Sequence, residues 1–213
     1  KKAKRLKKIA LFDLSKNKTN ILNYDTKTRN MIKRNLNNTV EFKKIDNQNF
    51  DHKQFILFKE NYINSMIEKK AKKFYFFNEA YFDRMVLLIK SDKAFLINAF
   101  HNDKIIAGAI FLYSHYISYY HLSFQKKYPG IMNTIIYKST LILQKKNKKF
   151  LVLGGGNLNS DDDNLLKFKI KMSNMVNYFY LESKIFNEKI YKQICNKIGI
   201  KKPKKLFFYR DHE

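Results

Sequence analysis

The segment FLVLGGGNLNSDDDNLLKFKIKMSN, residues 150–174, sets three consecutive glycines between an apolar run and a lysine-rich stretch. Gly154, Gly155 and Gly156 end what reads as a buried strand, at the place where open α/β sheets bind ligands. Without side chains, they let backbone N–H groups approach a bound group closely. They would equally suit a sharp turn that requires positive φ, and both interpretations can hold together.

In the same segment, Lys169 follows Phe168 in the sequence LKFK. On a helix, Phe168 and Met172 share the buried face, which puts Lys169 at the edge of that face. There its ammonium group could reach a carbonyl oxygen or a phosphate as a fixed positive charge. The alternative is one more exposed lysine in a lysine-rich chain. Lys167 and Lys171 are predicted to face solvent.

A further group of candidate residues lies in the sequence YYHLS, on a predicted strand. Strict alternation sends Tyr119, His121 and Ser123 to one face of that strand. It sends Tyr120 and Leu122 to the other face. Either face could meet a substrate. His121 titrates near neutrality and could accept the proton of an amine, and the alternative is a hydrogen-bonded structural histidine.

Two clusters of charged residues also call for an interpretation. Arg29, Lys33 and Arg34 line one edge of a predicted helix and could hold the phosphates of a tRNA or the pyrophosphate of a lipid, although such contacts carry no sequence readout. The alternative is a solvated helix face. The three aspartates at 161–163 precede a predicted helix, whose positive N-terminus they suit better than a metal ion. We therefore predict no metal site.

The composition sets broad limits on the class of protein. The 213 residues carry 43 Lys and Arg against 18 Asp and Glu, a formal net charge of +25. This charge would attract phosphates, nucleic acid or anionic lipid. The single cysteine, Cys195, excludes an internal disulfide and is predicted to be buried. No apolar run approaches the ~18–20 residues of a membrane span, and no signal peptide is evident, so we expect a cytoplasmic protein.

The period of the hydrophobic pattern changes along the chain from 3.6 to 2 and back. Very short links join three β-rich runs in the middle, which predicts an antiparallel meander. We expect a basic N-terminal segment with the first strand in 1–20, one domain in 21–200 and a basic tail in 201–213. The predicted strands are 9–14, 40–45, 94–100, 104–113, 116–125, 150–154 and 178–186, and the predicted helices include one from Asp51, 78–90, 131–146, 162–172 and 187–198.

The chain resembles the FemABX branch of the GNAT superfamily, the aminoacyl or peptidyl transferases of cell-wall synthesis, and the related single-domain GNAT-like proteins. The pieces that carry the resemblance are KTRNMIKRNLNN, FFNEAYF, IIAGAIFLYSHYISYYHLS and FLVLGGG with LLKFKIKMS, in the family's order. The resemblance implies an α/β (α+β) fold with a GNAT-like mixed, mostly antiparallel central sheet flanked by helices. It also implies that Phe168 and Lys169 match the family's Phe-Lys motif near the transfer centre, and that Tyr120 and Tyr81 contact substrate.

Two departures from the family pattern affect the substrates. Full FemABX proteins carry two tandem GNAT-like domains, whereas 213 residues hold one. Either an N-terminal GNAT-like domain is missing here, or the chain is a one-domain relative. The common coenzyme A loop, Gln/Arg-x-x-Gly-x-Gly/Ala, is also missing, since the chain reads FQKKYPGIMN at that position. Aminoacyl-tRNA is therefore the favoured donor over acyl-CoA.

Together these features predict an N-acyltransferase that moves an aminoacyl or acyl group to an amine of a cell-envelope precursor, peptidoglycan or surface sugar. We expect no tightly bound cofactor. The expected partners are tRNA, an anionic or lipid-linked envelope precursor and the inner face of the membrane, with the oligomeric state left open. The alternative, from a different class, is a noncatalytic basic module that binds nucleic acid or an anionic membrane.

Overall fold

The computed structural model describes residues 3–15, 20–37, 40–157, 160–182 and 184–199. The fold divides into two compact units. The larger unit comprises residues 8–177 and contains every candidate site residue. The smaller unit combines the described residues 3–7, 178–182 and 184–199, and in it the Arg5 guanidinium lies 4.3 Å from the centroid of the Tyr178 ring.

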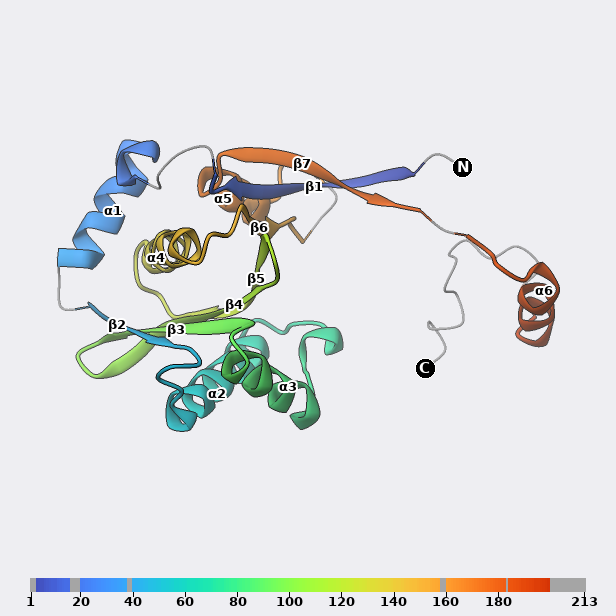
Figure 1. The fold of residues 1–213 in the computed structure, drawn as a ribbon, viewed down its shortest axis with the longest axis horizontal. Helices are drawn as coiled ribbons and strands as arrows, with labels where there is room; N and C mark the ends of the chain where they lie inside the picture. The colour runs from blue at the N-terminus through green and yellow to red at the C-terminus, as the bar shows by residue number, and fades with distance from the viewer. Residues whose placement is uncertain (1–2, 16–19, 38–39, 158–159, 183, 200–213) are drawn as a thin grey trace. The chain divides into compact units, whose positions relative to one another are not determined.

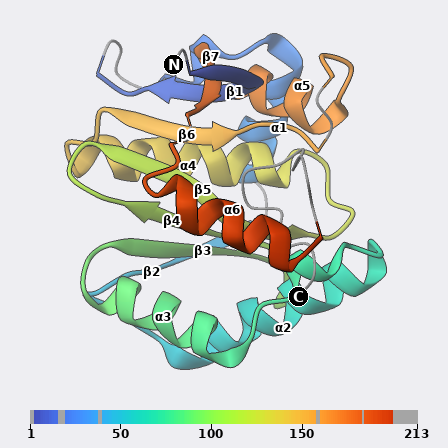
Figure 2. The same cartoon turned by 90° about the vertical axis from the view of Figure 1, so that its right-hand side faces the viewer.

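Seven strands form one mixed, mostly antiparallel sheet in the order β2-β3-β4-β5-β6-β1-β7 (Figures 1 and 2). The predicted meander is confirmed, because β4 pairs antiparallel with both β3 and β5. β5 and β6 run parallel, and β6 then pairs antiparallel with β1. The strands are β1 (Lys4–Asp13), β2 (Val40–Ile45), β3 (Ala94–His101), β4 (Lys104–Tyr113), β5 (Ile117–Gln125), β6 (Phe150–Gly154) and β7 (Met175–Leu181).

The helices begin where the sequence supplies capping groups. Asp51 accepts hydrogen bonds from the backbone N–H groups of Lys53 and Gln54, as its place before the helix predicts. Asn78 caps the next helix in the same way. The helices are α1 (Thr26–Asn37), α2 (His52–Glu68), α3 (Glu79–Lys90), α4 (Ile131–Lys145), α5 (Asn164–Lys171) and α6 (Glu188–Lys197), with 3-10 turns η1 (Ile21–Asn23) and η2 (Lys73–Tyr75).

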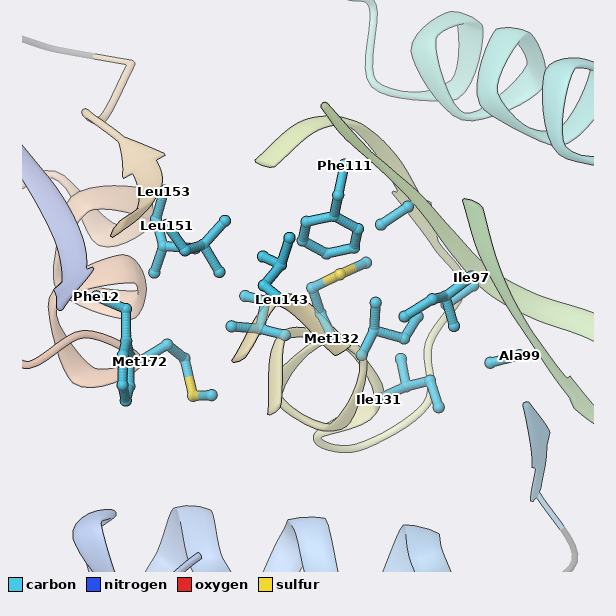
Figure 3. Close-up of a cluster of buried hydrophobic side chains, with 14 of the residues drawn as sticks. Phe12, Ile97, Ala99, Phe111, Ile131, Met132, Leu143, Leu151, Leu153 and Met172 are labelled. Carbon is cyan, nitrogen blue, oxygen red and sulfur yellow. The ribbon is translucent and has the colours of Figure 1, made fainter. Parts of the chain in front are cut away.

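Two apolar clusters cover the two faces of the sheet. Helices α1 and α4 supply one cluster and helices α2 and α3 supply the other (Figures 1 and 2). The central strand β4 contributes side chains to both clusters, since Phe111 belongs to the first cluster and Ile110 to the second. Figure 3 shows the first cluster, in which Met132 and Leu143 of α4 lie near side chains of the strands. Burial on both faces explains why β3 and β4 are almost uninterrupted apolar runs.

A bulge in β5 overturns the predicted alternation of its side chains. Ile110 of β4 pairs with Leu122, but Phe111 pairs with Tyr120, so His121 has no partner in this register. One extra residue in a strand reverses the faces on either side of it. Tyr120 therefore packs in the cluster of α1 and α4, whereas Leu122 packs in the cluster of α2 and α3. The prediction that Tyr120 and Leu122 share a face is wrong, and so is the prediction that Ser123 lies on the face opposite Tyr120.

Other sequence expectations need smaller adjustments. The strand predicted at 178–186 is β7 at Met175–Leu181, and the helix predicted at 162–172 is α5 at Asn164–Lys171. Cys195 is buried, as its helical neighbours predict, with 6% of its surface exposed. Among the described residues, no helix combines the length and the apolar character needed to cross a membrane. The predicted C-terminal tail at 201–213 lies outside the described residues.

Candidate acyl-transfer site

The strands β5 and β6 part halfway along β5. Their parallel pairing runs over three residue pairs and ends at Tyr119 with Val152. β5 then continues to Gln125, whereas β6 ends at Gly154. The predicted divergence of strand 150–154 from its neighbour is confirmed. Beyond the last pair, the facing edges of β5 and β6 no longer pair with each other, which makes this opening a candidate place for a ligand.

Lys169 lies at this opening and contacts two other predicted site residues. Its Nζ donates a hydrogen bond of 2.8 Å to the carbonyl oxygen of Gly155. The same Nζ lies 5.9 Å from the centroid of the Tyr120 ring. The residue is partly buried, and its neighbour Phe168 packs against the cluster of α1 and α4. Lys169 is therefore held in place by its contacts with Gly155 and Tyr120, as a fixed positive charge requires.

The glycine segment has two structural reasons for its composition. Gly154 adopts φ +82°, which confirms the sharp turn that the sequence offered as one interpretation. At Gly156, an added Cβ would lie 2.3 Å from a carboxylate oxygen of Asp163. That carboxylate caps α5 by accepting from the N–H of Leu166. Gly154 therefore permits the turn that ends β6, and Gly156 leaves room for the carboxylate that caps α5, the helix that carries Lys169. A role of the glycines in ligand binding stays a prediction.

Tyr120 and Ser123 form a pair on the same face of β5. The Tyr120 hydroxyl donates a hydrogen bond of 2.5 Å to the Ser123 Oγ, and its ring packs against Phe111 with centroids 5.6 Å apart. Burial raises the pKa of Tyr120 to about 12, so its hydroxyl is neutral at physiological pH. A neutral hydroxyl beside a fixed lysine can donate to, or accept from, a polar substrate group.

His121 and Tyr81 form a second pair on the side of α2 and α3. The Tyr81 hydroxyl and the His121 Nε2 share a short hydrogen bond, although the two residues are 40 positions apart. Desolvation lowers the pKa of His121 below its ordinary value, which favours the neutral imidazole. Desolvation likewise raises the pKa of the Tyr81 hydroxyl. In the tautomer whose Nε2–H donates to the Tyr81 oxygen, Nδ1 keeps the lone pair with which a neutral imidazole accepts a proton.

Phe77 is also part of this arrangement, although it is not among the site residues predicted from the sequence. Its ring stacks on the Tyr81 ring, with centroids 3.9 Å apart and planes 11° apart. The signal was present in the sequence FFNEAYF, since Phe77 lies four positions before Tyr81, next to the start of α3. Phe77 therefore fixes the ring whose hydroxyl meets His121.

The basic edge of α1 does not join these groups. Arg29 is half-buried and donates 3.3 Å to the Thr26 Oγ1 of its own helix, and Lys33 and Arg34 are exposed. Within the described chain, none of the three forms a hydrogen bond or an ion pair with Lys169 or His121. A phosphate-binding role for this edge stays a prediction, as a site separate from the opening.

The three aspartates behave as helix-capping and surface residues. Asp163 caps α5, Asp161 pairs with Lys8 at 2.6 Å, and Asp162 pairs with Lys167 at 3.0 Å. In the part of the chain that the structure describes, no group of His, Cys, Asp or Glu side chains could hold a metal ion. Lys167 and Lys171 are exposed, as the helical pattern predicts.

Comparison with known proteins gives similarity in structure only. No family model and no curated protein matches the sequence. FemX matches with a TM-score of 0.66 over 90% of this chain at 11% identity, and the match covers 64% of the FemX chain. L-PGS from Bacillus licheniformis matches with a TM-score of 0.62 over 95% of this chain at 16% identity, and the match covers 67% of that chain.

A third solved structure agrees with these two. It is the C-terminal domain (DUF2156) of a protein assigned as a lysylphosphatidylglycerol synthetase from Agrobacterium fabrum. Its TM-score is 0.64 over 84% of this chain at 15% identity, and the match covers 60% of its own length. The chain thus spans about two thirds or less of these proteins. The resemblance read from the sequence is confirmed at the level of the fold: the chain has a GNAT-like fold, with FemX and the L-PGS and DUF2156 proteins as structural neighbours.

Proposed function

We propose that the chain is an N-acyltransferase that moves an aminoacyl or acyl group from an activated donor to an amine of a cell-envelope precursor. The observation that carries this proposal is the opening between β5 and β6, beside which Lys169 is fixed by Gly155. The GNAT-like fold supports acyl transfer as the class of reaction.

An acyl group bound in the opening could be reached by side chains from both faces of the sheet. Lys169 and Tyr120 lie on the side of α1 and α4, and His121 and Tyr81 lie on the side of α2 and α3. Ordinary alternation along β5 makes this possible, because it turns the neighbouring residues Tyr120 and His121 to opposite sides. We therefore place the donor carbonyl near Lys169 and the acceptor amine near His121.

The reaction then follows from these positions. The acceptor nitrogen attacks the carbonyl carbon, and the oxygen that becomes negative is stabilised by the Lys169 ammonium group. His121 takes one proton from the attacking nitrogen. The new C–N bond is retained, the ester or thioester bond to the donor breaks, and the leaving oxygen or sulfur receives the proton. Neither a metal nor a bound cofactor is needed in this scheme.

The turn before α4 supports an aminoacyl-tRNA donor over acyl-CoA. In the GNAT pattern, the coenzyme A loop lies here and its backbone amides hold the pyrophosphate. In this chain α1 occupies the turn. An added Cβ on Gly130 would lie 2.6 Å from the Cβ of Met31, and Asn35 donates 3.1 Å to the carbonyl oxygen of Pro129. The turn is thus packed against a helix, which leaves less room for a nucleotide.

The decisive experiment is single-turnover transfer by the whole chain. Aminoacyl-tRNA and acyl-CoA donors are supplied separately, each with an amine-bearing lipid-linked peptidoglycan precursor or an amino sugar as acceptor. We expect amide formation to be faster with aminoacyl-tRNA, and mass spectrometry of the acceptor would detect the added group. Absence of transfer from both donors to both acceptors would contradict the proposal and favour a noncatalytic binding module.

The basic edge of α1 supplies a separate prediction about the donor. If Arg29, Lys33 and Arg34 contact tRNA phosphates, replacing all three with glutamine will weaken tRNA binding and reduce its salt dependence. Loss of three phosphate contacts should lower the slope of log affinity against log salt by about 2–3. Binding is measured by filter retention over a salt series. An unchanged slope would assign these residues to solvent.

A further inference from the structure

The connection between α2 and α3 has a composition unlike that of any other loop in the described chain. Residues 69–77 read KKAKKFYFF, and we refer to them as the aromatic–basic loop. They hold four lysines and four aromatic residues without an acid. All four lysines are exposed: Lys69, Lys70, Lys72 and Lys73. Positive charge and large apolar rings are thus presented by one short surface segment.

The rings of the aromatic–basic loop are open to solvent to an unusual degree. Phe74 has 77% of its surface exposed, and Tyr75 and Phe76 have 39% and 40% exposed. Ile67, on the last turn of α2, adds another exposed apolar side chain at 59%. Adjacent exposed rings are costly in water, and such patches on soluble surfaces mark contacts with a protein or a membrane.

The base of the loop is fixed by contacts with α2 and α3, so the exposed rings are held in defined positions. The Tyr62 hydroxyl of α2 donates 3.0 Å to the carbonyl oxygen of Tyr75. Phe77 stacks on Tyr81 of α3. The Phe74 ring meets Phe77 edge-on, with centroids 6.4 Å apart. A preorganised loop loses less conformational entropy on binding than a flexible one.

We propose that the aromatic–basic loop docks the chain on an anionic bilayer surface. Phenylalanine and tyrosine partition into the interfacial zone of a bilayer. Lysines beside them are attracted to anionic headgroups, and each increases partitioning by about fivefold. The aromatic rings of the loop therefore suit the interfacial zone of the bilayer, and its lysines suit the anionic headgroups. Phe74 enters the interface, and Lys72 and Lys73 remain among the headgroups.

The packing of the rings favours a bilayer over a single-stranded nucleic acid. Binding of bases requires a series of rings whose flat faces are open for stacking. Here Tyr81 covers one face of Phe77, and the Tyr62 ring lies nearly parallel to Phe77 with centroids 6.4 Å apart. Phe74 is engaged edge-on by Tyr75 as well, at 5.5 Å between centroids. Insertion of ring edges into lipid does not require open faces.

Docking at this loop would also bring the candidate site close to the bilayer. Phe77 belongs to the loop and stacks on Tyr81, whose hydroxyl meets His121. The side of the sheet with the proposed proton acceptor would then be held close to the bilayer, where a lipid-linked amine is presented. This last consequence rests on the proposed acyl transfer, whereas membrane docking itself does not.

The test uses the absence of tryptophan from the chain. A Phe74→Trp variant of the whole chain carries one fluorophore at the proposed point of insertion. With phosphatidylglycerol vesicles, we expect a blue shift of its emission and quenching by brominated acyl chains. Leu22→Trp is the matched control, since Leu22 is 61% exposed but lies in η1, next to α1. Equal spectra for the two variants, with and without vesicles, would overturn the proposal.

Vesicle sedimentation supplies the second measurement, without donor or acceptor present. Relative to wild type, Lys72→Gln with Lys73→Gln should lower partitioning onto phosphatidylglycerol vesicles by about 25-fold, and Phe74→Ser by about tenfold. The charge-matched control is Lys53→Gln with Lys104→Gln, two exposed lysines outside the loop. An equal loss of vesicle partitioning in the control would show that only the overall charge matters, and it would overturn the proposal. So would Phe74-dependent binding of an RNA oligonucleotide without vesicle binding.

Discussion

Replacing Lys169 with methionine is expected to lower the single-turnover rate of acyl transfer by about 10²–10³-fold while the fold survives. The methionine side chain keeps much of the length and packing of lysine but removes the charge that the hydrogen bond to Gly155 holds at the opening. A fixed cation beside a developing oxyanion stabilises the transition state more than the ground state, so the loss should appear in turnover more than in substrate affinity.

Lys171→Met is the matched control for this prediction. Lys171 is exposed at the end of the same helix. Its replacement should leave transfer within about twofold of wild type, since exposed charges contribute little. Equal rates in the two variants would refute the role of Lys169. Thermal unfolding of both variants is measured in parallel, because loss of the fold in Lys169→Met would identify a structural lysine.

Replacing His121 with glutamine is expected to lower the transfer rate by about 10²–10³-fold and to change its pH dependence. Desolvation lowers the pKa of His121 below its ordinary value. The neutral base form therefore persists below that value, and wild-type transfer should fall only as the pH drops through the lowered pKa. The ratio of wild-type to variant rates should decline in that acidic window, because the variant has no imidazole to protonate.

Two further variants separate the chemistry of His121 from its surroundings. Tyr81→Phe keeps the ring that stacks on Phe77 and removes the hydroxyl that meets His121, so a loss of about fivefold to tenfold is expected. His115→Gln, at an exposed position between β4 and β5, should leave the rate and its pH profile unchanged. A His121→Gln profile that runs parallel to wild type would contradict the proton-acceptor role.

The sequence by itself determined the secondary structure and the class of fold. Hydrophobic periodicity placed the meander strands and α2 to α4 within a few residues, since a helix and a strand repeat their buried positions with different periods. Short links fixed the antiparallel pairing of β3, β4 and β5. Capping residues such as Asp51 act on their own next few backbone groups, so they too can be recognised locally.

The position of Lys169 could also be predicted in part from the sequence. The pattern of α5 put this lysine at the edge of a buried face, and the triple glycine marked the turn that leads to it. Both are local properties. Its two partners, the carbonyl oxygen of Gly155 and the ring of Tyr120, come from the segment just after β6 and from β5. Which partners a side chain meets depends on how elements distant in sequence are packed, and spacing alone does not specify this.

Only the tertiary structure decided the faces of β5 and the strand partners of β6. The bulge at His121 arises from the register between β4 and β5, so strict alternation within the strand failed to predict it. The pairing of β6 with β5 joins residues 33 positions apart, and its pairing with β1 joins residues more than 130 positions apart. The opening beside Lys169 and the contact of Tyr81 with His121 therefore come from chain packing, because they depend on contacts between distant residues that no local pattern encodes.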